Sequence, residues 1–222
     1  MNPFKLFGKR DVCLWLCSLA AASVSGIMAG VSSVNGVLSL TASLIGVTGL
    51  IFLAIRSVWG QILTVVFSVV YGIVSVRCAY WGEVITYMGM TMPMAVIAAV
   101  QWIRHSDKDT GRVETAKLTV RQAVRMCILA AAVTLVFGAV LAKLNTANIV
   151  FSVISVTTSF LAVYLSYLRS PYYACAYAAN DVVLIILWIL MSAEDRSCFP
   201  MVINFIIFLI NDIYGFISWR KA

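Results

Sequence analysis

The sequence contains few charged residues. Only 11% of its 222 residues are Asp, Glu, Lys or Arg, whereas 62% are hydrophobic and the mean hydropathy is +0.98. A soluble domain has about 25% charged and about 45–50% apolar residues. The shortage of charge therefore excludes an ordinary soluble domain and indicates a chain built for a lipid bilayer.

Histidine is nearly absent, and the cysteines are not spaced as metal ligands. His105 is the single histidine, and catalytic signatures such as Gly-x-Ser-x-Gly or an intramembrane His are missing. Cysteines inside apolar runs behave as small hydrophobic residues, so we expect no metal, no cofactor and no disulfide framework. An intramembrane enzyme would have to rely on Asp181 and Asp212 pairing across helices. The six cysteines are Cys13, Cys17, Cys78, Cys127, Cys175 and Cys198.

Long apolar runs make up most of the chain. About 20 apolar residues in a helix span the hydrocarbon core of a bilayer. The first run follows Lys5, Lys9 and Arg10 like a signal peptide, but it exceeds the usual apolar length of such peptides and is predicted to be a retained helix. The eight predicted spans are 12–31, 35–55, 59–77, 84–103, 122–142, 148–168, 173–191 and 199–218. Together they form one integral membrane domain over residues 1–222.

Basic residues predict the orientation of the spans. With eight spans both termini share a side, and thirteen of the sixteen Lys and Arg residues lie on that side. The other side holds only Arg77, Lys143 and Arg196. The positive-inside rule then places both termini in the cytoplasm. It also accounts for the net charge of +7 without a nucleic-acid partner.

The chain also shows a weak internal repeat. A shift of 113 residues aligns Asn35, Arg56 and Ser57 with Asn148, Arg169 and Ser170, and Trp102 then falls near Trp219. Residues 35–103 and 148–218 would each contain three spans, and the single helix 122–142 between them would give both triplets the same orientation. This 3+1+3 parallel repeat, with 12–31 as an accessory helix, is a known transporter plan that binds substrate between the repeats. The loop 104–121 is expected to be a solvated linker.

Two Asn-Asp pairs stand at membrane depth in the last two spans. Asn180 and Asp181 lie at the middle of the seventh span, and Asn211 and Asp212 lie in the eighth. A charged residue near a helix centre costs about 2.5–3.5 kcal/mol on insertion scales, so intramembrane carboxylates indicate function. Asn and Asp can instead bond neighbouring helices together. With 100° per residue around a helix, Asn204 lies on the same face as Asn211. Asp212 lies about 80° away from Asn204 around the helix axis.

Aromatic residues accompany these polar groups. Tyr177 and Trp188 share the face of Asp181, while Tyr87 and Thr91 lie on one face of the fourth span, which Pro93 is expected to kink. Flat heteroaromatic rings stack on Trp and Tyr, and sugar hydroxyls bond to Asn and Asp. The combination favours a vitamin or nucleoside ligand. Tyr80, Trp81 and Glu83 are instead expected at the outer membrane interface.

Three stretches of this sequence resemble a known family. They are "WGQILTVVFSVVYGIVSVRCAYWGEVITYMGMTMPM", "AANDVVLIILW" and "FLINDIYGFISW". Together they resemble the Pnu family of bacterial vitamin transporters, and the similarity runs from about Asn35 to Trp219. Its most specific part is the closing pattern of Asn211, Asp212, Tyr214, Gly215 and Trp219. The resemblance implies an all-α helix bundle related to the SWEET sugar transporters, in the bacterial cytoplasmic membrane.

The resemblance also implies a substrate and a mechanism. The best known members carry nicotinamide riboside by facilitated diffusion, and cytoplasmic phosphorylation traps the vitamin for NAD synthesis. Those members often carry a W-x-x-W motif followed by Asn, whereas this chain has "YAANDVVLIILW" with a single Trp188. Thiamine and riboflavin, which relatives carry, therefore stay open as substrates.

The sequence-based mechanism is a uniporter in which the substrate ring stacks on Trp188 or Tyr177. The substrate hydroxyls would bond Asn180, Asn211 and Asp212. Proton-coupled uptake through Asp181 and Asp212 is an alternative, as is a receptor subunit that binds without transporting. The many Gly and Ala residues also leave a homo-oligomer open. The predicted substrate-binding residues are Asn180, Asp181, Trp188, Asn204, Asn211, Asp212, Tyr177, Tyr87 and Thr91.

Overall fold

The computed structural model describes residues 6–28, 34–77, 80–146, 148–194 and 199–221. In this part of the chain, eight helices are long and apolar enough to cross a membrane. They confirm the eight predicted spans, and every predicted boundary lies within three residues of an observed one. Their bounds are α1 Lys9–Met28, α2 Val34–Ala54, α3 Val58–Arg77, the composite fourth span Trp81–Arg104, α6 Val120–Lys143, α7 Ile149–Tyr167, α8 Tyr173–Glu194 and α9 Phe199–Arg220.

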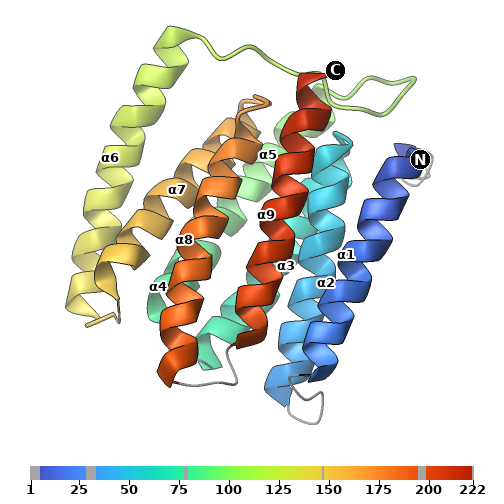
Figure 1. The fold of residues 1–222 in the computed structure, drawn as a ribbon. Helices are drawn as coiled ribbons and strands as arrows, with labels where there is room; N and C mark the ends of the chain where they lie inside the picture. The colour runs from blue at the N-terminus through green and yellow to red at the C-terminus, as the bar shows by residue number, and fades with distance from the viewer. Residues whose placement is uncertain (1–5, 29–33, 78–79, 147, 195–198, 222) are drawn as a thin grey trace.

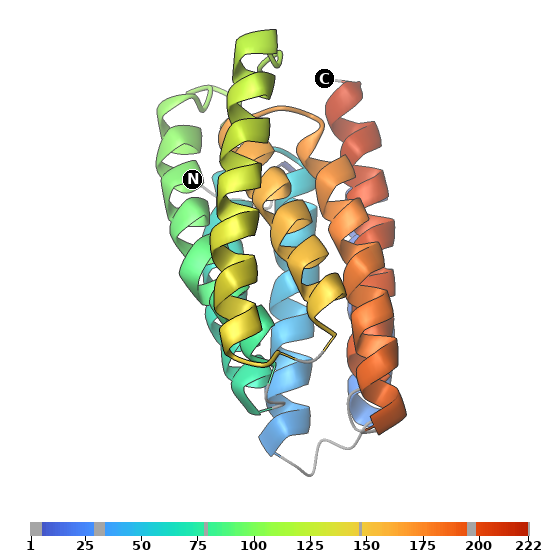
Figure 2. The ribbon, with the colours of Figure 1, turned by 90° about the vertical axis from the view of Figure 1, so that its left-hand side faces the viewer.

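Six of the spans close into a ring. α2 packs on α3, α3 on α5, α5 on α7, α7 on α8, α8 on α9, and α9 returns to α2. The other two spans lie outside this ring: α1 packs on α2 and α9, and α6 packs on α7 (Figures 1 and 2). Most of α6 is exposed, which fits a helix that faces lipid along much of its surface.

The fourth span is not one continuous α-helix. It consists of α4 (Trp81–Val84), the π-helical segment η2 (Ile85–Thr91) and α5 (Met92–Arg104). Pro93 lies in the first turn of α5, where its missing N–H is tolerated. The interruption of the α-helix is a π-helical segment that comes before the proline. π-helical turns are frequent at functional sites.

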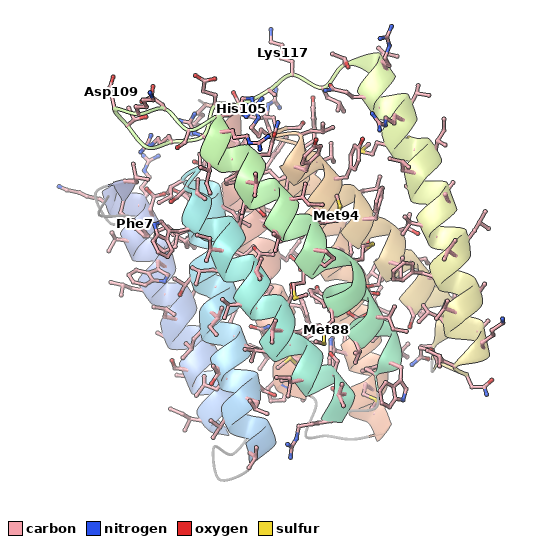
Figure 3. The ribbon with its side chains drawn as sticks, turned by 180° about the vertical axis from the view of Figure 1, so that it is seen from behind. Phe7, Met88, Met94, His105, Asp109 and Lys117 are labelled. Carbon is pink, nitrogen blue, oxygen red and sulfur yellow. The ribbon has the colours of Figure 1, made fainter. Side chains whose placement is uncertain are left out.

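One end of the bundle carries both the start of α1 and the end of α9. The loop between α5 and α6, with His105, Asp109 and Lys117, lies at the same end (Figures 1 and 3). We call it the loop end, and the other the opposite end. The loop stops where Thr119 and Gln122 form a reciprocal capping box that begins α6.

The loop is more than the solvated linker predicted from the sequence. Val113 is fully buried in a cluster with Leu53, Trp102 and Trp219. Its backbone N–H donates to the carbonyl of Arg56 at 2.9 Å, and the N–H of Ala116 donates to the carbonyl of Arg169 at 2.9 Å. The loop therefore ties together two turns that are far apart in the sequence.

These two turns have the same geometry. Arg56 follows α2 with φ 62°, and Arg169 follows α7 with φ 57°. In each turn the next amide donates to the carbonyl five residues back, at 2.9 Å after Arg56 and 3.0 Å after Arg169. Both helices therefore end in a Schellman motif with a left-handed Arg in the position usually taken by Gly. The shift of 113 residues predicts this correspondence.

Two tryptophans make reciprocal bonds beside these turns. Trp102 Nε1 donates to the carbonyl of Ser166 at 2.8 Å, and Trp219 Nε1 donates to the carbonyl of Leu53 at 2.8 Å. Leu53 and Ser166 are themselves 113 residues apart. The two indole rings also contact each other, with centroids 5.5 Å apart. Each half of the ring is thus anchored to the other by an equivalent bond.

Candidate functional site

A small cavity lies inside the six-helix ring. It has a volume of about 40 Å³ and is walled by α2, α3, η2, α8 and α9. A pocket that encloses a small-molecule ligand usually measures about 300–1,000 Å³, so the structure has a closed arrangement of the helices. The lining residues are Gly46, Gly49, Leu50, Leu53, Leu63, Thr64, Phe67, Tyr87, Thr91, Tyr177, Asn180, Asp181, Phe208 and Asp212.

Two carboxyl groups meet at this cavity. Asp181 on α8 and Asp212 on α9 both line the cavity, are each only 3% exposed, and are close enough for their charges to interact. Asp181 Oδ2 has no partner among the described residues. The residues that line the cavity in this part of the chain include no Lys, Arg or His. The site therefore contains two acidic groups without a basic residue beside them, and one of its acceptors, Asp181 Oδ2, is unsatisfied.

Asn180 is held in place from the neighbouring helix. Its Oδ1 accepts hydrogen bonds from Thr158 Oγ1 at 2.8 Å and Ser159 Oγ at 2.9 Å, both on α7. Asn180 and Tyr87 on η2 both line the cavity. The two bonds from α7 fix the orientation of the Asn180 amide.

Aromatic rings form much of the remaining wall. Phe67 stacks on Tyr71 with centroids 5.3 Å apart and contacts Tyr87 at 5.9 Å and Phe208 at 5.5 Å. Sequence reasoning did not select Phe67 or Phe208 as site residues. A Phe inside an apolar helix resembles any other packing residue, although Phe208 does share the face of Asn204 and Asn211. The arrangement can take a flat ring between its aromatic faces.

The π-helical turn positions two predicted residues. Tyr87 and Thr91 both lie on η2 and both line the cavity. Thr91 Oγ1 has no partner among the residues that the structure describes, although it is 2% exposed. The interrupted helix thus leaves a buried hydroxyl available at the cavity wall.

Six of the nine predicted residues line this cavity, and three lie elsewhere. Trp188 lies two turns beyond Asp181, where its Nε1 donates to Tyr71 Oη at 3.0 Å and its ring contacts Tyr80 at 5.1 Å. It is fully buried in an aromatic cluster toward the opposite end. The structure does not bring Trp188 to the cavity in this arrangement. The six that line it are Tyr87, Thr91, Tyr177, Asn180, Asp181 and Asp212.

Asn211 and Asn204 are not among the residues that line the cavity. Asn211 Nδ2 donates to Ser18 Oγ on α1 at 2.9 Å and to the Ile207 carbonyl at 2.8 Å. Asn204 is 2% exposed, and its amide atoms have no partner among the described residues. Asn211 therefore joins two helices, which is the second of the two roles that the sequence left open.

The expectation for the start of the fourth span needs correction. Tyr80 and Glu83 are 2% and 1% exposed, so they pack against neighbouring helices and are not exposed at a membrane interface. Glu83 Oε1 accepts a hydrogen bond from Ser155 Oγ at 3.2 Å, and Tyr80 Oη donates to the Leu187 carbonyl at 3.2 Å. Only Trp81, at 46% exposed, matches the expectation. Tyr and Glu have polar tips that a neighbouring helix can satisfy, and the sequence does not show that neighbour.

Comparison with known proteins identifies the family. A family model described as nicotinamide mononucleotide transporter matches residues 36–221, which include nearly all of α2 through α9. The chain belongs to this transporter family. It is also similar to the nicotinamide riboside transporter PnuC of Neisseria mucosa, with 22% identity over 189 residues, 83% of this chain and 72% of the relative. The crystal structure of a vitamin B3 transporter PnuC has the same fold, with a TM-score of 0.83, 20% identity and coverage of 97% of this chain and 92% of that chain.

Membership in the nicotinamide mononucleotide transporter family fixes the broad function. The chain is a multi-pass membrane transporter, as the resemblance to the Pnu family predicted. α1 lies entirely outside the matched residues. The cavity, in contrast, is formed entirely by helices inside the matched region.

We expect one glycine to control the size of the cavity. A Cβ at Gly46 on α2 would overlap the ring of Phe208, so Gly46→Ala should push this ring into the cavity. Overpacking of this kind costs about 1–3 kcal/mol, and uptake per folded molecule should fall several-fold in a liposome assay. Gly138→Ala on α6 is the control, because its Cβ would meet Val153 Cγ2 at an ordinary 3.5 Å. Equal uptake by the Gly46→Ala and Gly138→Ala proteins would contradict the assignment.

Proposed function

We propose that this protein carries the unphosphorylated vitamin nicotinamide riboside into the cell. The observation that supports this substrate is the charge of the cavity. Two carboxyl groups, Asp181 and Asp212, line it together with aromatic rings and amide groups, without a basic residue among the described lining. The pyridinium ring of nicotinamide riboside is a cation, which both a carboxylate and an aromatic face stabilise.

The same charge argues against a phosphorylated substrate. A phosphate monoester carries a charge of about −1.5 to −2 at neutral pH, and proteins bind it with Arg, Lys or backbone N–H groups. In this cavity it would face two acids. We therefore infer that the nucleoside, and not the mononucleotide in the family's description, is the substrate. Thiamine is also a cation, so charge alone does not separate it from nicotinamide riboside.

The proposed binding mode uses the residues of the cavity wall. The ring stacks on Tyr87, Tyr177 or Phe67, and the ribose hydroxyls bond Asn180, Asp181 and Asp212. A cavity of about 40 Å³ holds only a few water molecules, so the substrate enters only when the helices separate. We place this movement between the triplets α2–α5 and α7–α9, as two parallel repeats that rock against each other around the site.

Observations at the loop end support the repeat. The matched turns at Arg56 and Arg169 and the reciprocal bonds of Trp102 and Trp219 are what two related halves would produce. In this plan α1 is an accessory helix and α6 is a linker. The loop end holds thirteen of the sixteen basic residues by the sequence-based assignment, so we place it in the cytoplasm of a bacterial cell and both termini with it.

The test is uptake of labelled nicotinamide riboside into liposomes that contain the purified protein. We expect uptake that equilibrates and is blocked by excess unlabelled nicotinamide riboside, but not by nicotinamide mononucleotide, thiamine or riboflavin. Block by the mononucleotide would overturn the charge argument. Block by thiamine or riboflavin alone would reassign the substrate within the family.

Proton coupling is a second candidate mechanism because Asp181 and Asp212 both line the cavity. Two neighbouring carboxyl groups can share one proton, and a carrier could release it on one side of the membrane. Our proposal is instead facilitated diffusion without enzymatic turnover, with net uptake driven by phosphorylation in the cytoplasm. If uptake follows an imposed pH gradient and stops when the gradient is collapsed, transport is coupled to protons.

A further inference from the structure

A second, larger pocket lies at the loop end, outside the six-helix ring. It has a volume of about 450 Å³ and opens at the surface between α1, the turn after α2, the loop before α6 and the end of α9. Its polar lining distinguishes it from the cavity between the triplets. The lining residues are Gly8, Lys9, Arg10, Asp11, Ala54, Ile55, Arg56, Arg112, Tyr214, Ser218 and Lys221.

Five cationic residues from four separate elements line this pocket. Lys9 and Arg10 come from α1, Arg56 from the turn after α2, Arg112 from the loop and Lys221 from the residue after α9. The positive-inside rule explains why basic residues lie at one end of the bundle. It does not require that elements so distant in the sequence place them around one concave surface.

The one acidic residue in the lining does not neutralise this charge. Asp11 Oδ2 accepts a hydrogen bond from the backbone N–H of Gly8 at 2.7 Å, and Asp11 Oδ1 accepts one from Tyr214 Oη at 2.6 Å. Both of its oxygens thus serve to cap α1 and to bond α9. Five positive charges against one negative charge leave a net charge of +4 on the lining.

Two of the cations come from segments that are bonded to each other, because the N–H of Val113, next to Arg112, donates to the carbonyl of Arg56 at 2.9 Å. The Schellman turn holds the backbone of Arg56, and one guanidinium nitrogen of Arg112 donates to the Leu6 carbonyl at 3.1 Å. Partial burial and the charge of Arg112 lower the pKa of Arg56. The remaining guanidinium N–H groups are suited to a tetrahedral anion, because Arg binds phosphate oxygens in a bidentate manner. The first turn of α1 adds the positive end of a helix dipole.

We propose that this pocket binds a phosphate group, with Arg56 and Arg112 as its principal ligands and Lys9, Arg10 and Lys221 around it. The phosphate belongs either to a soluble phosphorylated compound or to the headgroup of an anionic phospholipid. A bound phosphate joins α1, the α2–α3 turn, the loop and α9, and it relieves the repulsion between the two arginines. The bound phosphate therefore stabilises the loop end of the folded protein.

The experiment measures the thermal midpoint of the full-length protein in detergent. One arm titrates inorganic phosphate against sodium chloride at equal ionic strength, and the other adds phosphatidylglycerol against phosphatidylcholine. We expect a rise of about 2–4 °C in at least one arm, because a ligand that binds only the folded state stabilises it. A rise with inorganic phosphate identifies a soluble phosphate, and a rise with phosphatidylglycerol alone identifies the lipid headgroup.

Variants decide whether the effect belongs to this pocket. The protein with both Arg56→Gln and Arg112→Gln should lose the rise, whereas Arg121→Gln, an exposed basic residue at the start of α6, should keep it. Lys221→Gln, on an exposed residue, provides a second test that does not disturb the turn or the loop, and it should reduce the rise. The proposal is overturned if neither probe raises the native midpoint, or if the double and Lys221→Gln proteins respond as the native protein does.

Discussion

Replacing either carboxylate of the cavity with its amide should nearly abolish transport. We expect Asp212→Asn and Asp181→Asn each to reduce the initial rate of nicotinamide riboside uptake by about 10–100-fold. Hydrogen bonds to charged groups are worth about 1.5–3 kcal/mol, and each 1.4 kcal/mol is a factor of ten. Both side chains are 3% exposed and line the cavity, so each is placed to contact the substrate in the proposed binding mode. The measurement is uptake into liposomes per folded molecule.

The neighbouring residue provides a matched control. Asn211 precedes Asp212 on the same helix, but its amide bonds Ser18 on α1 and not the cavity. Asn211→Ala should therefore lower the thermal midpoint, because a buried bond is lost, while uptake per folded molecule stays within about two-fold of the native value. If Asn211→Ala abolishes uptake and Asp212→Asn does not, the assignment of the two faces of α9 is reversed.

The second large effect concerns stability. Trp102→Ala and Trp219→Ala should each destabilise the protein by about 3–5 kcal/mol, as is usual for a fully buried Trp. The two indoles are 0% and 1% exposed, and each donates one bond across the ring of helices. Because their surroundings are equivalent, the two losses should be similar. The measurement is denaturant or thermal unfolding of the purified protein in detergent.

Milder variants separate the bond from the packing. Trp102→Phe and Trp219→Phe keep most of the ring, so each should cost about 1–2 kcal/mol through the lost hydrogen bond. Trp59→Ala and Trp81→Ala, on residues that are 46% exposed, should have little effect. A large loss at only one of the two buried positions would contradict the equivalence of the two halves.

Hydropathy alone was enough to place the eight spans. In hydrocarbon each backbone N–H and C=O must be bonded within its own helix, so an apolar run of the right length has one stable conformation. Thr119 and Gln122 even mark the start of α6 locally, because a capping box is a short-range feature. The π-helical segment before Pro93 was not predicted, because a proline in a span indicates an irregular helix but not the form that the irregularity takes.

The candidate site was predicted in part. Asn180, Asp181 and Asp212 could be selected from the sequence because a polar side chain in a long apolar run costs free energy in the membrane. Such a residue is therefore expected to have a functional role. Asn211 met the same criterion, yet in the structure its amide bonds Ser18 on α1. Neighbouring residues on a helix point about 100° apart. The sequence therefore predicts that Asn211 and Asp212 are both at membrane depth, but it does not show which helix each one faces. Tyr80 and Glu83 were misplaced for the same reason.

The sequence by itself determined the membrane environment, the number and limits of the spans, the family and the depth of the polar groups. Those properties depend on composition and on interactions within one helix. Only the tertiary structure decided that Asp181 and Asp212 meet, that Phe67 and Phe208 complete the cavity and that five basic side chains gather around one pocket. Helices in a membrane choose their neighbours through close packing and a few polar contacts between distant residues, and a linear pattern does not record those contacts.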